Sequence, residues 1–399
     1  MTVRANKPAF NIREKLKELT QSIGLKGSEL MRAATAQDAR DLVSAGRKNI
    51  IINGDMAIDQ RNSGSSVSLT SSNSSQYCVD RFQLWNYPSG VTGVYTIQRL
   101  TSNPAPGFEH YLRWTVTTAA TPSGNHFYAI QQAIEGNNVK ALAIGTSHPK
   151  PSVVSFWVRS SIAGNRSFSL YVAGATTVNY TVNYTINTAD VWEYKTVKIP
   201  PLASGNGTGT GISTSVIVSW SMGMGTTYGT TDTTDGFYSN KYELGNAVKQ
   251  VQFANSTFDI TGVQFEVGKN ATDFEYLSYG EQLALCQRYY YRITPGLGAF
   301  WGTGVQYNST QTIIFIPFPV IMRDAVTAVE TTGSASDYRL IYGTGTANCS
   351  TVPTYGGDAN RFSQTVNFNV SSGAAGAAGD CVIGRSGSNN AFLAWSAEL

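Results

Sequence analysis

Residues that could catalyse a reaction are few in this chain of 399 residues. It holds three histidines, His110, His126 and His148, and a serine hydrolase needs such a base beside a nucleophile and an orienting acid. Within NGDM, residues 53–56, Met56 stands where a GDS-type nucleophile motif requires serine. Glycoside hydrolysis needs two carboxylates about 5–10 Å apart, and acidic residues are sparse in the strand-rich part of the chain. We therefore expect a protein that is not an enzyme.

The charge pattern argues against two classes of partner. Charged residues make up 14% of the chain and the net charge is +3, so no electrostatic feature indicates nucleic acid. The N-terminal MTVRANKPAF lacks the apolar core of a secretory signal. The most apolar run, residues 312–322, contains Pro317 and Pro319 and is about half the length of a membrane span. We expect neither nucleic-acid binding nor membrane insertion.

Helical patterns concentrate at the front of the chain, in residues 1–48. Asn11-Ile-Arg-Glu14 is a capping-box pattern, and further apolar residues follow at helical spacing. Helices this short are not stable alone in water, so they must pack on a partner. The residues expected to serve oligomerisation or attachment are Ile12, Leu16, Leu19, Ile23 and Leu30.

From residue 49 to 277 the pattern changes to strands. Leu112, Trp114 and Val116 alternate with polar neighbours, which is typical of strands with one buried face. Similar runs recur up to TGVQFEVG at residues 261–268, among them VKQVQF, and Ser/Gly/Asn-rich stretches at 62–76 and 203–212 suggest long loops. We predict a jelly-roll-like β-sandwich, with Trp114 and Trp157 in its core.

A short helix is predicted at residues 278–288, where Ser278-Tyr-Gly-Glu281 forms another capping box. RYYYRI then alternates like a strand, which would place Tyr289 and Tyr291 on one face and Tyr290 on the other. Further strand-like runs fill residues 289–399. The fold class is therefore mainly β: short N-terminal helices, the sandwich, a connecting helix and a smaller C-terminal β domain.

Several segments, in this order, resemble a module of bacteriophage tail-fibre and related virion proteins. They are NIIINGDMAIDQRNSG, YCVDRFQLW, PSVVSFWVRSS, VWEYKTVKIP and TFDITGVQFEVGKNATDFEYLSYGEQLALCQRYYYRI. FPVIMRDAVTAV and FLAWSAEL resemble the companion C-terminal domain, and ELMRAATAQDARDLVSAG resembles helical segments near the front of such fibres. The resemblance covers most of the chain from about residue 28. Val326 departs from it, because the pattern there is MR-x-x-P-T.

The resemblance implies a homotrimeric tail fibre, assembled in the host cytoplasm and located in the virion tail. Its N-terminal segment would bind other virion proteins, and its β part would bind host surface polysaccharide. A structural virion component, such as a head decoration, neck or baseplate protein, is the first alternative, and a glycan depolymerase is the second.

Two kinds of site follow from this resemblance. Aromatic rings stack on the apolar faces of sugars, and the candidates, most of them next to glycines in the C-terminal part, are Trp301, Tyr307, Tyr342 and Tyr355. Sandwiches that bind carbohydrate often hold one structural Ca²⁺, and Asp55 and Asp259 are candidate ligands. The alternative for both aspartates is turn capping without a metal. No other cofactor is expected.

Overall fold

The computed structural model describes residues 47–69, 75–87, 93–174, 178–203, 211–343, 345–358, 360–371 and 377–399. All helices and strands below lie in the compact unit Ile50–Leu399. Within the described residues, none of the helices has the length and apolar character needed to span a membrane. The predicted oligomerisation residues, Ile12 to Leu30, lie outside the described residues.

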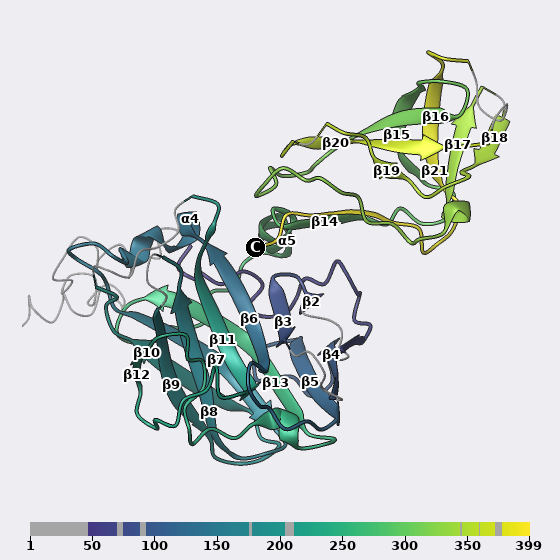
Figure 1. Cartoon of the computed structure of the whole chain (residues 1–399). Helices are drawn as coiled ribbons and strands as arrows, with labels where there is room; N and C mark the ends of the chain where they lie inside the picture. The colour runs from purple at the N-terminus through teal and green to yellow at the C-terminus, as the bar shows by residue number, and fades with distance from the viewer. Residues whose placement is uncertain are drawn as a thin grey trace, which may run out of the picture. The chain divides into compact units, whose positions relative to one another are not determined.

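The mainly β fold is confirmed, and all its strand pairs within sheets are antiparallel. A six-stranded sheet has the order β1 (Val67–Leu69), β4 (Val94–Leu100), β5 (Tyr111–Thr118), β13 (Thr257–Val267), β7 (Ser152–Ser160) and β10 (Glu193–Ile199). A seven-stranded sheet has the order β12 (Gly236–Tyr238), β9 (Val178–Ile186), β8 (Gly164–Val172), β11 (Thr214–Met224), β6 (Phe127–Glu135), β3 (Phe82–Tyr87) and β2 (Ser75–Val79). These two sheets form the sandwich (Figure 1).

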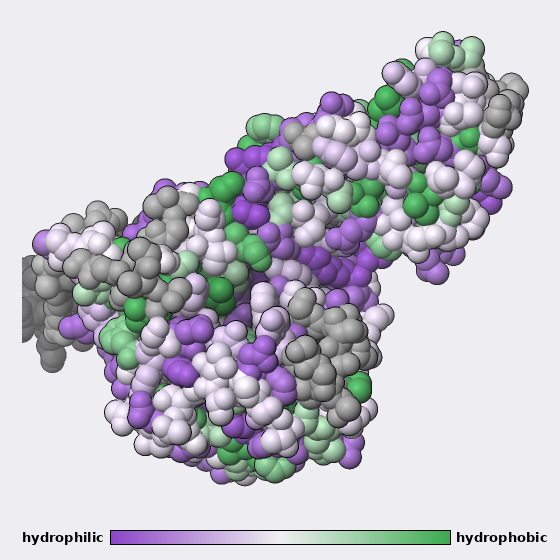
Figure 2. Space-filling model, viewed as in Figure 1, coloured by the Kyte–Doolittle hydropathy of each residue, from purple (hydrophilic) through white to green (hydrophobic). Residues whose placement is uncertain are grey.

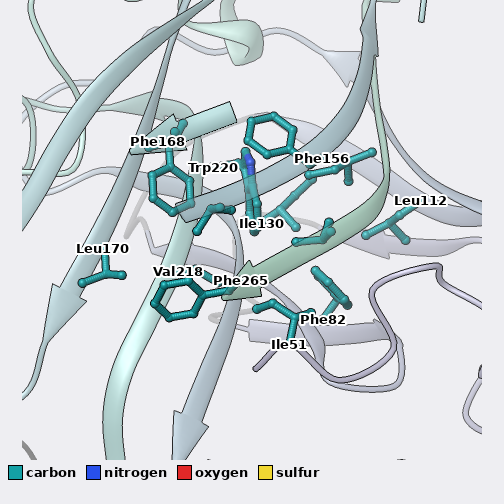
Figure 3. Packing of buried hydrophobic residues seen from close by; sticks show 14 of the residues in the cluster. Ile51, Phe82, Leu112, Ile130, Phe156, Phe168, Leu170, Val218, Trp220 and Phe265 are labelled. Carbon is teal, nitrogen blue, oxygen red and sulfur yellow. The ribbon is translucent and has the colours of Figure 1, made fainter. Parts of the chain in front are cut away.

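One continuous apolar core lies between the two sheets. Trp220 of β11 is buried at its centre, with ring centroids 5.5 Å from Phe156 and 5.4 Å from Phe168. Figure 3 shows these rings turned toward one another from both sheets. The period of two in the sequence places one side of every strand here, which confirms the prediction for Trp114.

Short helices interrupt the strands: α4 (Gly136–Val139), η1 (Lys140–Leu142), η2 (Gln250–Gln252), η3 (Ala335–Asp337) and α5 (Tyr279–Gln287). The capping box of α5 is confirmed, because Glu281 N–H donates to Ser278 Oγ and the Glu281 carboxylate accepts from Ser278 N–H. The strand predicted for VKQVQF is wrong. Gln250 is buried there as an acceptor for Arg166, so tertiary hydrogen bonds override the alternation.

Beyond α5, strand β14 (Tyr290–Ile293) pairs with β22 (Leu393–Ser396). Between them a second seven-stranded sheet, called the C-terminal sheet below, has the order β18 (Gly345–Asn348), β17 (Tyr338–Tyr342), β21 (Cys381–Ser386), β15 (Phe300–Gln306), β16 (Gln311–Pro317), β20 (Ser363–Asn369) and β19 (Thr354–Tyr355). It has its own core around Tyr338, Leu340 and Phe368.

The three tyrosines after α5 anchor both sides of this connection. Tyr289 packs with Cys286, Ile52 and Ile58, while Tyr291 stacks on Trp395 with centroids 5.8 Å apart. The predicted common face for Tyr289 and Tyr291 is therefore wrong, because β14 begins only at Tyr290. Both side chains nevertheless serve packing within the protein.

The visible surface in Figure 2 mixes hydrophilic and hydrophobic residues.

Trp157 contributes to the surface of the six-stranded sheet rather than to its core. It is half-buried beside Tyr194, with ring centroids 5.6 Å apart. The prediction for Trp157 fails because Phe156 and Val158, on either side of it, already point inward. The predicted 62–76 loop also contains β1.

Candidate functional site

The four predicted aromatic residues lie at separate places on the C-terminal sheet. Trp301 is 7% exposed and packs beside Tyr338 in the core, with ring centroids 5.7 Å apart. Gly384 makes room for it, since a Cβ there would lie 2.5 Å from Ile314 and 3.3 Å from the indole. Tyr342 on β17 and Tyr355 on β19 are half-buried near opposite edges of the sheet. Tyr307 is 63% exposed, so it alone of the four presents most of its surface.

The two predicted calcium ligands have protein partners. Asp259 is buried, and its two carboxylate oxygens accept hydrogen bonds of 2.7–2.8 Å from Arg113 and Arg159. Asp55 accepts from the side-chain amide of Gln282. Within the described ranges, the structure gathers no group of three or more His, Cys, Asp or Glu side chains that could hold a metal. Two guanidinium groups already balance Asp259, and calcium binding stays a prediction.

The buried carboxylates of the described residues likewise have partners within the protein. In the described part of the chain the buried acidic residues are Asp80, Glu135, Glu243, Asp259 and Glu266. Glu135 pairs with Arg288 at 3.0 Å, Glu243 pairs with Lys249, and Glu266 accepts from Thr272 N–H at 2.8 Å. Asp80 accepts from both the backbone and the side chain of Gln60. Each of these five carboxylates therefore has a structural partner.

A different set of polar side chains lies on the outer side of the sandwich's seven-stranded sheet, where its members are buried and continue into exposed aromatic residues. Five polar residues lie directly opposite one another across strands β3, β6, β11, β8 and β9. We call them the polar row: Gln83, Gln131, Ser219, Ser169 and Thr181. Gln131 Nε2 donates to Ser219 Oγ at 2.7 Å, which fixes the direction of its amide. The oxygen of that amide remains available as an acceptor.

The polar row follows from the alternation of side chains on each strand, because successive residues point to opposite faces of the sheet. Leu84, Ile130 and Val218 point into the core, so their neighbours in sequence point outward. Across the sheet, the register then aligns these outward residues into a continuous strip. Ser169 Oγ is buried and has no hydrogen-bond partner among the described residues, so the strip retains unused hydrogen-bonding capacity.

Aromatic residues border the polar row. Trp85 and Tyr87 follow Gln83 on the same face of β3, and they are 38% and 45% exposed. Tyr87 lies opposite Phe127, whose ring is 5.2 Å from that of Tyr228. We call Gln83, Trp85, Tyr87 and Gln131 the β3 face.

The connection between β11 and η2 covers the other end of the polar row. Thr181 Oγ1 donates to the carbonyl of Lys241 at 2.5 Å, and Leu244 N–H donates to Ser167 Oγ at 2.9 Å. Burial raises the pKa of Tyr242 to about 12, so this hydroxyl stays protonated. Within the β3 face, Trp85 and Tyr87 are exposed, while Gln83 and Gln131 are 8% and 5% exposed. The face contains no Asp, Glu, His, Lys or Arg side chain.

Sequence reasoning missed the β3 face, although FQLWNY contains its signal. Gln83, Trp85 and Tyr87 alternate with Phe82, Leu84 and Asn86. Trp85 and Tyr87 fall on the side opposite Phe82 and Leu84, which lie in the core. An exposed aromatic pair at this spacing can stack on an apolar sugar face. The adjacent amides can exchange hydrogen bonds with its hydroxyls.

No protein-family model and no curated protein matches the chain. Among solved structures, it is similar to the enzymatically active domain of tailspike protein 4 from bacteriophage CBA120, with 11% identity over 55% of this chain and 21% of that chain, at a TM-score of 0.28. The chain thus spans about a fifth of that tailspike structure. It is also similar to a putative sugar binding protein from Bacteroides thetaiotaomicron, with 12% identity over 55% of this chain and 100% of that chain, at a TM-score of 0.31.

A third similar structure is the family 11 carbohydrate-binding module from Clostridium thermocellum, in complex with a mixed-linked tetrasaccharide. The identity is 11% over 53% of this chain and 100% of that chain, at a TM-score of 0.26. With identities and TM-scores this low, we draw no function from these matches. The case for a binding site rests on the side chains of the β3 face.

Proposed function

We propose that this protein is a non-enzymatic, glycan-binding component of a bacteriophage tail fibre, and that the β3 face binds a neutral glycan. The observation that carries the proposal is the pair Trp85 and Tyr87, exposed on one strand beside the largely buried amides of Gln83 and Gln131. Neighbouring exposed aromatic residues form an apolar patch, and such a patch is a candidate interaction site.

The geometry of the β3 face suits a chain of sugars. Residues two apart on a strand lie roughly 6.6 Å from each other, so Trp85 and Tyr87 can each contact a different sugar ring. Gln83 and Gln131 lie directly opposite each other and supply donors and acceptors beside the rings. Because the face has no charge, the ligand we propose is neutral.

The virion role is supported by the ordered segments that resemble tail-fibre modules. The proposal includes attachment to other virion proteins through the N-terminal segment, assembly as a homotrimer, and location in the virion tail. A weak site on each of three chains would give a large gain in avidity when they engage one cell surface.

The test of the β3 face is an alanine series probed on an array of neutral glycans. Trp85→Ala and Tyr87→Ala should each weaken binding by about tenfold. Each substitution removes the stacking free energy of one ring, on the order of 1 kcal/mol, in addition to the free energy of burying its apolar area. Tyr194→Ala is the matched control, because Tyr194 is also 45% exposed but lies on the other sheet. Equal affinities for all variants, or no binding of wild type to any neutral glycan, would contradict the proposal.

A second experiment separates receptor binding from a purely structural virion role. Host cells are coated with the purified protein, and the adsorption rate of the parent phage is measured. Saturable inhibition by wild type, reduced for Trp85→Ala, supports receptor binding. No inhibition by a folded protein favours the structural alternative.

A further inference from the structure

A row of four side chains crosses the outer face of the C-terminal sheet. Phe300 on β15 lies opposite Arg385 on β21, Arg385 lies opposite Arg339 on β17, and Arg339 lies opposite Asn348 on β18. These strands are consecutive in the sheet (Figure 1). We call these four residues the arginine row, and neighbouring strands about 4.8 Å apart make it roughly 14 Å long.

The two arginines of this row place like charges on neighbouring strands. Like charges directly opposite on neighbouring strands destabilise a sheet. Within the described residues, neither Arg339 nor Arg385 lies within ion-pair distance of a carboxylate. The fold thus places two arginines directly opposite each other without an ion pair that would offset their repulsion.

Most N–H donors of the two guanidinium groups have no acceptor among the described residues and can bind a ligand. Arg385 Nε donates to the carbonyl of Gly298 at 3.0 Å. Arg339 Nε is buried and has no acceptor among the described residues. A buried donor without an acceptor costs free energy, and an anion lying against the row would supply acceptors for both arginines.

The ends of the row indicate what kind of anion fits. Phe300 is 58% exposed and Asn348 is exposed. A ring that can stack on a pyranose and an amide that can bond hydroxyl groups thus flank two carboxylate-binding groups. On one side the row borders Thr303, Ile383 and Ile341, which bring no negative charge.

We propose that the arginine row is a second binding site, specific for a carboxylate-bearing sugar of an acidic polysaccharide. The carboxylate lies between Arg339 and Arg385, the sugar ring stacks on Phe300, and Asn348 contacts a hydroxyl of the adjoining sugar. This inference extends the proposed glycan-binding function to a separate sheet and a different ligand class. Because arginine stays charged at all physiological pH values, the site responds to salt rather than to pH.

The test uses isothermal titration of the full chain with trigalacturonate and with a trimer of sialic acid. Each is compared with its fully methyl-esterified, neutral form. At least one acidic trimer should bind, its methyl ester should bind at least tenfold more weakly, and added salt should weaken the acidic complex. Arg339→Gln and Arg385→Gln should each reduce the affinity about tenfold or more.

Controls separate this site from the β3 face and from general charge. Lys198→Gln removes one exposed positive charge elsewhere and should leave binding unchanged, and so should Trp85→Ala. Thermal melting verifies that the arginine variants remain folded. The proposal is overturned if neither acidic trimer outperforms its ester, if binding survives both arginine substitutions, or if sodium phosphate binds as tightly as the trimers. Failure of the β3 face alone would leave these results intact.

Discussion

Two sheets of this protein treat neighbouring arginines in opposite ways. On the six-stranded sheet, Arg113, Asp259 and Arg159 lie directly opposite one another on β5, β13 and β7. On the C-terminal sheet, Arg385 and Arg339 lie opposite each other on β21 and β17, with no carboxylate between them. Both rows are on outer faces, so burial in a core does not explain the difference.

The first row is complete within the protein. Both oxygens of Asp259 are taken by guanidinium groups, and Arg159 also lies 4.6 Å from the ring centroid of Trp192. Such a network holds strands and loops together. The second row leaves donors unused, which is what a site for an external anion requires. The first row therefore contains structural arginines, and the second contains arginines that we assign to ligand binding.

The largest effect is expected where an arginine is fully buried. Arg81 is 1% exposed and pairs with Glu398, which also binds Arg61 at 3.1 Å. Glu398→Gln should lower the free energy of unfolding by about 4 kcal/mol, because it leaves a buried charge uncompensated. Denaturant unfolding measures this change. Asp324→Asn is the control, since that carboxylate is 54% exposed and 3.8 Å from Arg323, and it should cost less than about 1 kcal/mol.

Removing the carboxylate of Asp259 should leave Arg113 and Arg159 without a counter-charge, as in the arginine row. Asp259→Asn leaves Arg113 and Arg159 facing an amide, and we expect a loss of about 3 kcal/mol, less than for Glu398 because Arg113 is 30% exposed. The melting temperature of the sandwich reports it. In the double variant with Arg113→Gln part of the loss should be recovered, and a single variant as stable as wild type would contradict the structural role of this row.

The strands were predictable from the sequence because their alternation is local. The spacing of Leu112, Trp114 and Val116 predicts which face of the strand is buried, whatever the position of the strand in the sheet. Adjacent aromatic residues are harder: in Phe300-Trp301 only one side chain can enter the core. A β-bulge and the absence of a side chain at Gly384 decide in favour of Trp301, and neither is visible in the local pattern.

The binding surfaces could not be predicted, since they depend on register between strands far apart in sequence. Nothing near Arg339 indicates that Arg385 will lie opposite it, and nothing near Gln83 indicates Gln131. Loop glycines were a poor guide to exposure, because Tyr342 and Tyr355 are both half-buried and Tyr342 packs against the core. Exposed Tyr307 keeps its predicted role as a candidate.

Asp80 is a buried carboxylate that forms no ion pair among the described residues. Burial raises the pKa of Asp80 to about 7, against the hydrogen bonds from Gln60 and the charge of Arg61, which lower it. At pH 5 the folded protein therefore holds a proton on Asp80 that the unfolded chain has lost. Raising the pH to 8 removes this proton from the folded state alone, which should lower the free energy of unfolding by about 2 kcal/mol. Unfolding of wild type and Asp80→Asn across this range measures it, and parallel pH profiles would refute the shift.

The smallest effect has the opposite sign, and it separates the two sheets most clearly. Without ligand, Arg385→Gln should raise the free energy of unfolding of the C-terminal sheet by about 0.5 kcal/mol, because it removes the repulsion by Arg339. Arg159→Gln, its counterpart in the first row, should instead destabilise, because it takes a hydrogen-bond donor from buried Asp259. Thermal melting in low salt compares the pair, and high salt should shrink the gain from Arg385→Gln. If both substitutions destabilise, Arg385 is structural too, and the unpaired row has a partner within the protein.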